Sequence, residues 1–94
     1  MIRHIVAWKF KPGEEEKAKE FIEKLLNLKD VIPQIVDMKA GFNKNNDGFF
    51  DAALVLDVAN ESDLETYKNH PEHKKVSALC KSIRLDRQSV DFEF

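Results

Sequence analysis

Residues 2–10 alternate in a pattern that predicts a β-strand with two apolar faces. One face carries every second residue, and its members are Ile2, His4, Val6, Trp8 and Phe10. The opposite face carries Ile5 and Ala7, because successive side chains of a strand point to opposite sides. A strand that is apolar on both faces belongs in the centre of a sheet that is covered on both sides.

The next stretch of the chain predicts a helix and two more strands. Apolar residues recur at three- and four-residue spacing over residues 14–28, which is the pattern of an amphipathic helix. Its apolar stripe consists of Ala18, Phe21, Ile22, Leu25 and Leu26. Residues 35–43 predict a second strand, and the polar residues 44–48 suit a hairpin turn. A third strand over about residues 50–58 is again apolar on both faces.

Two helical segments and a last strand complete the chain. Ser62 and Glu65 have the spacing of a capping box, so we expect a helix to start near residue 62, with Leu64 and Tyr67 pointing inward. Pro71 suits the first turn of a second segment. The apolar stripe of that segment is Val76, Leu79, Cys80 and Ile83. The last strand has Val90, Phe92 and Phe94 on one face and Ser89, Asp91 and Glu93 on the other.

The order of these elements is βαββαβ, which predicts an α+β domain of the ferredoxin-like class. Both helical regions would cover one face of a four-stranded antiparallel sheet. The uncovered face would carry apolar residues of three strands, namely Ile5, Ala7, Ala53, Val55, Val90, Phe92 and Phe94. An apolar sheet of this size is unfavourable in a monomer. The sequence therefore predicts a two-fold homodimer in which two sheets face each other, a dimeric α/β barrel.

The composition and the net charge of the chain indicate which kinds of molecule it is suited to bind. At 94 residues the chain predicts one domain over residues 1–94. Fifteen Lys and Arg against 17 Asp and Glu leave a formal charge of -2, which favours neither nucleic acid nor an anionic membrane as a partner. No apolar run has the length of a membrane span or a signal peptide, so we expect a cytoplasmic protein. The single cysteine, Cys80, is interpreted as a small core residue.

Several segments of the chain resemble one protein family. Residues 2–10 resemble the first strand of the stress-responsive dimeric α/β-barrel (Dabb) family, and residues 41–43 resemble the end of its second strand. The segment Tyr67-Lys68-Asn69-His70-Pro71-Glu72-His73 is similar to the family's Y-x-x-H-P-x-H motif, and residues 90–92 resemble its ending. The resemblance extends over essentially the whole chain. It implies the same fold and the same dimer that the apolar pattern predicts.

The resemblance also implies a candidate site. In plant polyketide cyclases of this family, a histidine of the first strand, a helix tyrosine, the second histidine of the motif and a late aspartate line a cavity between helices and sheet. Matched position by position, these are His4, Tyr67, His73 and Asp91. A further tyrosine of those cyclases aligns with Leu25, so one polar group of the pocket is missing here.

We expect chemistry that needs neither a cofactor nor a metal ion. A carboxylate such as Asp91 next to His73 would fix the tautomer of the imidazole and raise its basicity. His73 could then take a proton from a carbon next to a carbonyl group, while Tyr67 or His4 polarises the oxygen. The ligand would be a small apolar carbonyl compound, and the activity that of a cyclase or lyase. The expected pocket residues are Trp8, Ile22, Leu25 and Leu54.

Simpler roles remain open for each of these residues. His70 is interpreted as a helix cap beside Pro71. His4 and Tyr67 also fit as core residues whose polar atoms are hydrogen-bonded. A zinc site on His70 and His73 is disfavoured because Pro71 breaks the helical spacing between them. The alternative function is a noncatalytic, stress-associated dimer that binds a small apolar ligand. A cavity beside His73 lined by Ile22, Leu25 and Leu54 would favour the enzyme. A collapsed pocket in which only the backbone holds His73 would favour the binding module.

Overall fold

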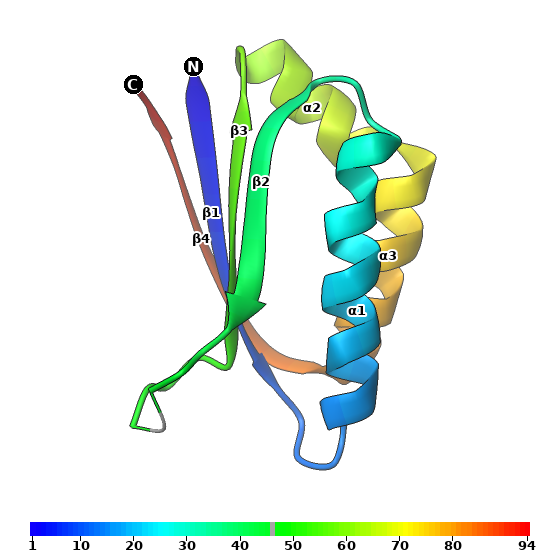
Figure 1. Ribbon diagram of the computed structural model, residues 1–94, viewed down its shortest axis with the longest axis vertical. Helices are drawn as coiled ribbons and strands as arrows, with labels where there is room; N and C mark the ends of the chain where they lie inside the picture. The colour runs from blue at the N-terminus through cyan, green and yellow to red at the C-terminus, as the bar shows by residue number, and fades with distance from the viewer. Residues whose placement is uncertain (46) are drawn as a thin grey trace.

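The computed structural model describes residues 1–45 and 47–94, which form four strands and three α-helices (Figure 1). Along the chain, the elements are β1 (Ile2–Phe10), α1 (Glu15–Asn27), the 3-10 turn η1 (Leu28–Asp30), β2 (Ile35–Phe42), β3 (Ala52–Val58), α2 (Glu61–Asn69), α3 (Pro71–Ile83) and β4 (Arg84–Glu93). The predicted turn over residues 44–48 includes Asn46, which lies outside the described residues.

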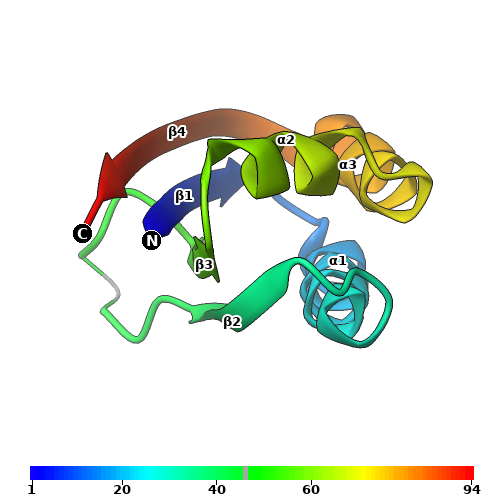
Figure 2. The ribbon, with the colours of Figure 1, turned by 90° about the horizontal axis from the view of Figure 1, so that it is seen from above.

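The four strands form one antiparallel sheet in the order β2-β3-β1-β4. The helices lie together on one face of the sheet, as the views of Figures 1 and 2 show. The predicted ferredoxin-like βαββαβ arrangement is therefore confirmed, with β1 between β3 and β4. Pairing between β1 and β4 sets His4 opposite Asp91 and Ile5 opposite Val90. This register decides which side chains share a face of the sheet.

The face of β1 that meets the helices is buried at every second residue, as the alternation predicts. Trp8, for example, packs edge-on against Phe21 of α1, with ring centroids 4.9 Å apart. The same face of β3 adds Ala52, Leu54, Leu56 and Val58, all buried. The aromatic residues Trp8, Phe10 and Phe21 are thus core residues, as interpreted from their spacing. The core lies between the sheet and the helices.

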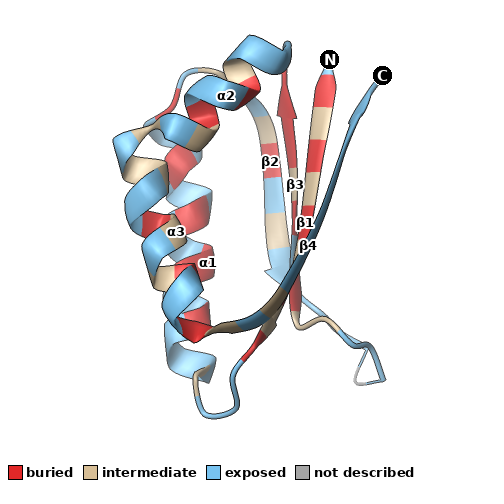
Figure 3. Cartoon of the chain, turned by 180° about the vertical axis from the view of Figure 1, so that it is seen from behind, coloured by how far each residue is buried: buried red, intermediate tan, exposed pale blue. Residues whose placement is uncertain are grey.

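The opposite face of the sheet is apolar and open. Figure 3 shows exposed residues along most of β4 and alternating buried and half-buried residues along β1. Val90, Phe92 and Phe94 retain 56%, 43% and 57% of their accessible surface. Their neighbours on this face are Ile5, Ala7, Ala53 and Val55. No helix of the described chain covers this face.

The chain between α2 and α3 changes direction at His70. Its backbone angles (φ -62°, ψ 134°) are extended, as favoured for a residue before proline, and Pro71 begins α3. The side chain of His70 caps α3 by accepting a hydrogen bond from the backbone N–H of Glu72 at 3.1 Å. The interpretation of His70 as a helix cap is confirmed.

Some predicted boundaries are wrong by one or two residues. Helix α2 begins at Glu61, because Asn60 rather than Ser62 caps it and accepts from the N–H of Asp63 at 2.8 Å. Strand β3 begins at Ala52, since the preceding Asp51 uses its carboxylate to accept from the N–H of Phe10. Over the described ranges, no helix combines the length and the apolar character that crossing a bilayer requires.

Candidate functional site

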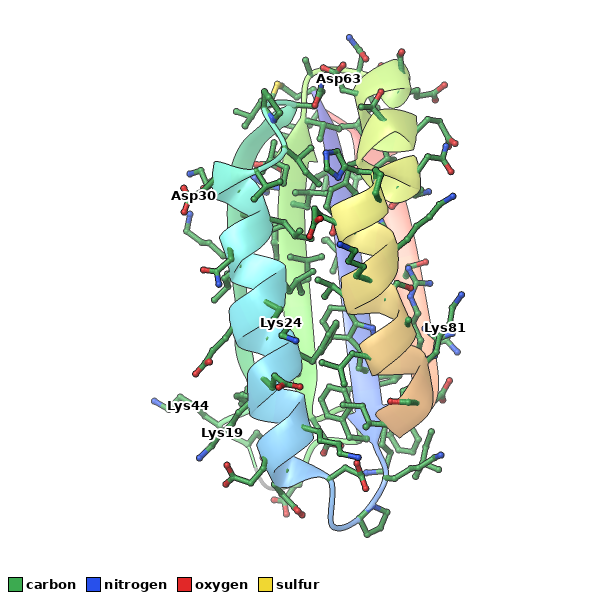
Figure 4. All side chains as sticks on the ribbon, turned by 90° about the vertical axis from the view of Figure 1, so that its right-hand side faces the viewer. Lys19, Lys24, Asp30, Lys44, Asp63 and Lys81 are labelled. Carbon is green, nitrogen blue, oxygen red and sulfur yellow. The ribbon has the colours of Figure 1, made fainter. Side chains whose placement is uncertain are left out.

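A small cavity lies between the sheet and the helices. Figure 4 looks at this layer of side chains with the helices in front of the sheet. We call this cavity the central cavity; its volume is about 50 Å³. Its polar lining consists of His4, Tyr67, His73, Ser77, Arg84 and Arg87, and its other lining residues are Val6, Trp8, Phe21, Leu25, Leu54, Val76 and Cys80. Three of the four predicted site residues therefore line one cavity, and the fourth, Asp91, contacts His4.

Asp91 forms a hydrogen bond with Nδ1 of His4. The two residues are directly opposite each other on neighbouring strands and point to the same face, so the contact follows from the sheet register. The carboxylate accepts the Nδ1 proton, which leaves Nε2 of His4 with a free lone pair. The second carboxylate oxygen lies 3.7 Å from the ammonium group of Lys68.

The expected pairing of Asp91 with His73 is wrong. Nδ1 of His73 instead lies 3.1 Å from the carbonyl oxygen of Lys68. That carbonyl would accept from the N–H of Glu72 in a continuous helix, but Glu72 donates to His70 at the break. A carbonyl oxygen only accepts, so Nδ1 of His73 carries the proton and Nε2 has a free lone pair. The Pro71 break thus fixes the tautomer that we had expected a carboxylate to fix.

Tyr67 lies between the two histidines. Its ring centroid is 4.4 Å from that of His73 and 6.4 Å from that of His4. Burial raises the pKa of Tyr67, so its hydroxyl keeps its proton at neutral pH and can donate a hydrogen bond. The cavity therefore brings together two imidazoles, each able to accept a proton at Nε2, and one hydroxyl group that can donate a hydrogen bond.

Burial lowers the pKa of both histidines below the usual value of 6.5. For His4 the loss of hydration outweighs the contact with Asp91, which acts in the opposite direction. For His73 the hydrogen bond that it donates to the carbonyl oxygen of Lys68 opposes the effect of burial, and the charges of His4, Arg87 and Lys68 add to that effect. Both imidazoles are therefore neutral at pH 7, the form that can accept a proton.

We predict that the free energy of unfolding falls as the pH drops below about 6.5. The unfolded chain then binds protons on His4 and His73 that the folded chain does not, because both folded-state pKa values are lowered. The slope is at most about 1.4 kcal/mol per pH unit for each histidine. Urea unfolding at pH 7, 6 and 5 and constant protein concentration measures it. An H73Q variant with the same slope as the wild type would contradict the contribution of His73.

All but one of the expected pocket residues line the central cavity. Trp8, Leu25 and Leu54 line the central cavity, whereas Ile22 is buried elsewhere in the core and its neighbour Phe21 takes that place. The sequence interpretation missed the polar residues Ser77, Arg84 and Arg87. Arg87 was accessible to the same reasoning as Asp91, because residues two and four positions apart share a face of a strand.

A larger surface groove of about 510 Å³ lies near the β1–α1 connection and the end of β2. Its lining includes Lys9, Lys11, Lys19 and Phe42 and none of the three histidines. We assign the candidate site to the central cavity because the imidazoles of His4 and His73 and the hydroxyl group of Tyr67 line it together. Within residues 1–45 and 47–94, no group of three or more His, Cys, Asp and Glu side chains could hold a metal ion.

The family model of the stress-responsive A/B barrel domain (Dabb) matches residues 2–94. This chain belongs to the Dabb family. A dimeric protein of unknown function with a ferredoxin-like fold from Bacteroides fragilis shares 30% of its residues with this Dabb chain, at a TM-score of 0.90. That alignment covers 99% of this chain and 95% of the other. The resemblance inferred from the motif at residues 67–73 is thereby confirmed.

Other solved structures share the fold of this Dabb domain. A dimeric ferredoxin-like protein of unknown function from Thermobifida fusca is 26% identical, with a TM-score of 0.89 and coverage of 99% of this chain and 90% of that one. The hydroxynitrile lyase of Passiflora edulis is 15% identical, with a TM-score of 0.85 and coverage of 97% and 90%. No curated protein sequence matches the chain.

Proposed function

We propose that this Dabb domain is a cofactor-free acid–base catalyst, a lyase or cyclase that removes a proton next to a carbonyl group. The observation that carries the proposal is the pair of neutral histidines in one cavity, His4 buried and His73 half-buried, each with its Nδ1 proton in a hydrogen bond and its Nε2 lone pair free. The hydrogen bond of His73 to a backbone carbonyl, taken alone, would equally fit a structural histidine of the core. Two such imidazoles can accept protons, and the neighbouring tyrosine hydroxyl can donate a hydrogen bond, which are the groups that acid–base catalysis requires.

The contact of Asp91 with His4 supports the choice of His4 as the base. When Nε2 of His4 accepts a proton, the imidazolium ion that forms lies against a carboxylate that stabilises it. His73 has no carboxylate partner, whereas Arg87 and Lys68 disfavour the protonated form of both histidines, so the contact with Asp91 is what favours His4. The proposed base therefore changes from His73, the sequence-based choice, to His4, with Asp91 as its positioning residue.

The other two groups complete a reaction cycle. The hydroxyl of Tyr67 donates a hydrogen bond to the carbonyl oxygen and stabilises the negative charge that develops there. In the lyase direction, Nε2 of His73 accepts the proton of a substrate hydroxyl group while the adjacent carbon–carbon bond breaks, and it returns that proton to the enolate carbon that is released. A plant lyase with the same fold supports this reaction class at the level of the fold.

The volume of the central cavity favours a small reacting group. About 50 Å³ corresponds to about two water molecules, since each occupies about 30 Å³ in the liquid. That space accommodates a carbonyl group with its neighbouring carbons and leaves any larger part of the substrate outside. The same space would also suit a noncatalytic binding module for a small apolar ligand. The small volume and the hold of His73 by a backbone carbonyl alone fit that alternative, whereas the hydrogen bond between His4 and Asp91 and the polar lining favour catalysis.

Exchange of protons for deuterium tests the proposal without a known substrate. Acetone, butanone, propanal and pyruvate are incubated with the protein in D₂O, and loss of the α-proton signal is followed by NMR. We expect exchange faster than in buffer, because removal of that proton is the proposed step. His4→Gln should lower the rate about 100-fold, the usual lower bound for a general base.

A matched control is provided by His70→Asn, which changes a histidine outside the cavity and keeps a good helix cap. This variant should exchange at the wild-type rate. A folded H4Q variant with wild-type exchange would contradict the role of His4. Rates equal to those in buffer for every compound would contradict the proposed function and leave the noncatalytic module.

We also propose that the domain functions as a homodimer through the open face of its sheet. Solved relatives from Bacteroides fragilis and Thermobifida fusca are described as dimeric, which supports the assignment. The face has an apolar centre, with a charged margin where the guanidinium group of Arg3 binds both carboxylate oxygens of Asp57 at 2.8 and 2.9 Å. An apolar core with a polar rim is the usual arrangement of an interface. The cytoplasmic location stays a prediction.

A further inference from the structure

Two arginines, Arg84 and Arg87, lie at the rim of the central cavity and take no part in the proposed proton transfer. Arg84 follows the end of α3, and Arg87 lies three residues further along β4, the edge strand. Arg87 is opposite Trp8 in the sheet, so its side chain starts from the face that meets the helices. Both residues line the cavity together with His4, Tyr67 and His73.

Neither arginine has a carboxylate partner in the part of the chain that the structure describes. Arg3, in contrast, forms a two-pronged ion pair with Asp57. The side-chain contact of Arg87 is a weak one, a hydrogen bond of 3.4 Å to the hydroxyl of Ser89. Asp91, further along the same face of β4, is already held by His4 and Lys68. The positive charge at the rim is therefore not balanced by these neighbours.

The positive charge of Arg87 influences the titratable groups inside the cavity. Arg87 disfavours protonation of both His4 and His73, and it favours loss of the proton from Tyr67 and Cys80. These four groups come from three different elements around the cavity. A positive potential acts on any ligand there and favours one with negative charge.

We propose that the substrate of the central cavity is a carbonyl compound that carries a carboxylate group, which binds Arg87 and Arg84 at the rim. The inference rests on the proposed function for the position of the carbonyl group, and it adds the substrate class. The planar fork of a guanidinium group matches the two oxygens of a carboxylate. The cavity holds only the reacting end, so the charged end remains at the exposed Arg87.

The same charge also assists the chemistry. Removal of a proton next to the carbonyl group produces an enolate, and its negative charge develops inside the cavity. The nearby guanidinium groups stabilise that charge more than the neutral carbonyl group that precedes it. A keto acid is therefore both bound and activated by the same pair of arginines.

Matched ligands and variants test the inference by binding alone. Pyruvate and levulinate differ in the spacing between carbonyl and carboxylate, and methyl isopropyl ketone and isoamyl methyl ketone are their uncharged counterparts of similar shape. The imidazole NMR signals of His4 and His73 report occupancy during titration. We expect at least one keto acid to bind about tenfold or more tightly than its uncharged counterpart, since charged hydrogen bonds add at least about 1.4 kcal/mol.

Three variants locate the charge that matters. Arg87→Gln should weaken binding of the keto acid about tenfold and leave the ketone unaffected, and Arg84→Gln should act in the same direction. Arg87→Lys should fall between Arg87→Gln and the wild type, because it keeps the charge and loses the fork. Lys81→Gln is the control, since it removes the same charge from the outer side of α3, away from the cavity (Figure 4).

Two results would overturn the inference. One is a keto acid that binds no more tightly than its uncharged counterpart. The other is an Arg87→Gln variant that binds as the Lys81→Gln variant does. Failure of the proposed function is distinguishable, because it would leave keto acid binding dependent on Arg87 but abolish deuterium exchange at the bound carbonyl compound.

Discussion

Replacing Val90 with aspartate is expected to convert the dimer into a monomer. Val90 lies on the open face of the sheet in one row with Ile5 and Val55, the centre of the apolar patch. A two-fold interface contains each residue twice, so the substitution brings two carboxylates into the same contact. Burying a charge without a partner costs several kcal/mol. The dissociation constant should therefore rise at least about 1000-fold, the equivalent of about 4 kcal/mol.

Light scattering or sedimentation at micromolar concentration measures the change. The wild type should have twice the monomer mass of 10.9 kDa, and the V90D variant should have the monomer mass. Val31→Asp is the control, because Val31 is exposed to a similar degree, 47% against 56%, but lies at the end of η1 away from the sheet face. A V90D variant that remains a dimer would contradict the sheet-face interface.

Replacing Leu56 with alanine is expected to destabilise the domain by about 3 kcal/mol, within the range measured for buried leucines. Leu56 is completely buried in β3, between His4 on one neighbouring strand and Met38 on the other. Its removal leaves a cavity in a layer where strands on both sides hold the backbone in place. The surrounding side chains can close such a cavity only in part.

Urea unfolding of the two proteins at equal concentration gives the difference. Leu26→Ala is the matched control, since Leu26 of α1 keeps 37% of its surface exposed. It should lower the free energy of unfolding by less than about 1 kcal/mol, as surface substitutions do. A cost at Leu56 as small as that at Leu26 would show that the centre of the sheet is not the packed core described above.

Secondary structure and sheet faces could be predicted from the sequence because both follow from local periodicity. The alternation of residues 2–10 placed His4 and Trp8 on the helix side, and the structure confirms this. The boundaries were less accurate at residues 60–62, where two polar side chains can each cap a helix. Which one does so depends on where β3 ends, and local pattern does not contain that information.

The residues of the central cavity were predictable in part, and their contacts were not. His4, Tyr67 and His73 line one cavity and Asp91 contacts His4, as the family motif implied for a shared site. The partner of Asp91 was wrong because it depends on the register between β1 and β4. Arg84 and Arg87 were missed because an arginine on an edge strand resembles any solvent-exposed residue until the cavity beside it is known.

The spacing of side chains within single segments was enough to predict the order of the elements and the two apolar faces of the sheet. The resemblance to the Dabb family supplied the candidate residues for the proposed proton transfer. The hydrogen-bond partner of each histidine and the position of the two unpaired arginines at the cavity rim became visible only in the folded domain. Such contacts join residues as far apart as His4 and Asp91, and strand register and the break at Pro71 select them from many alternatives.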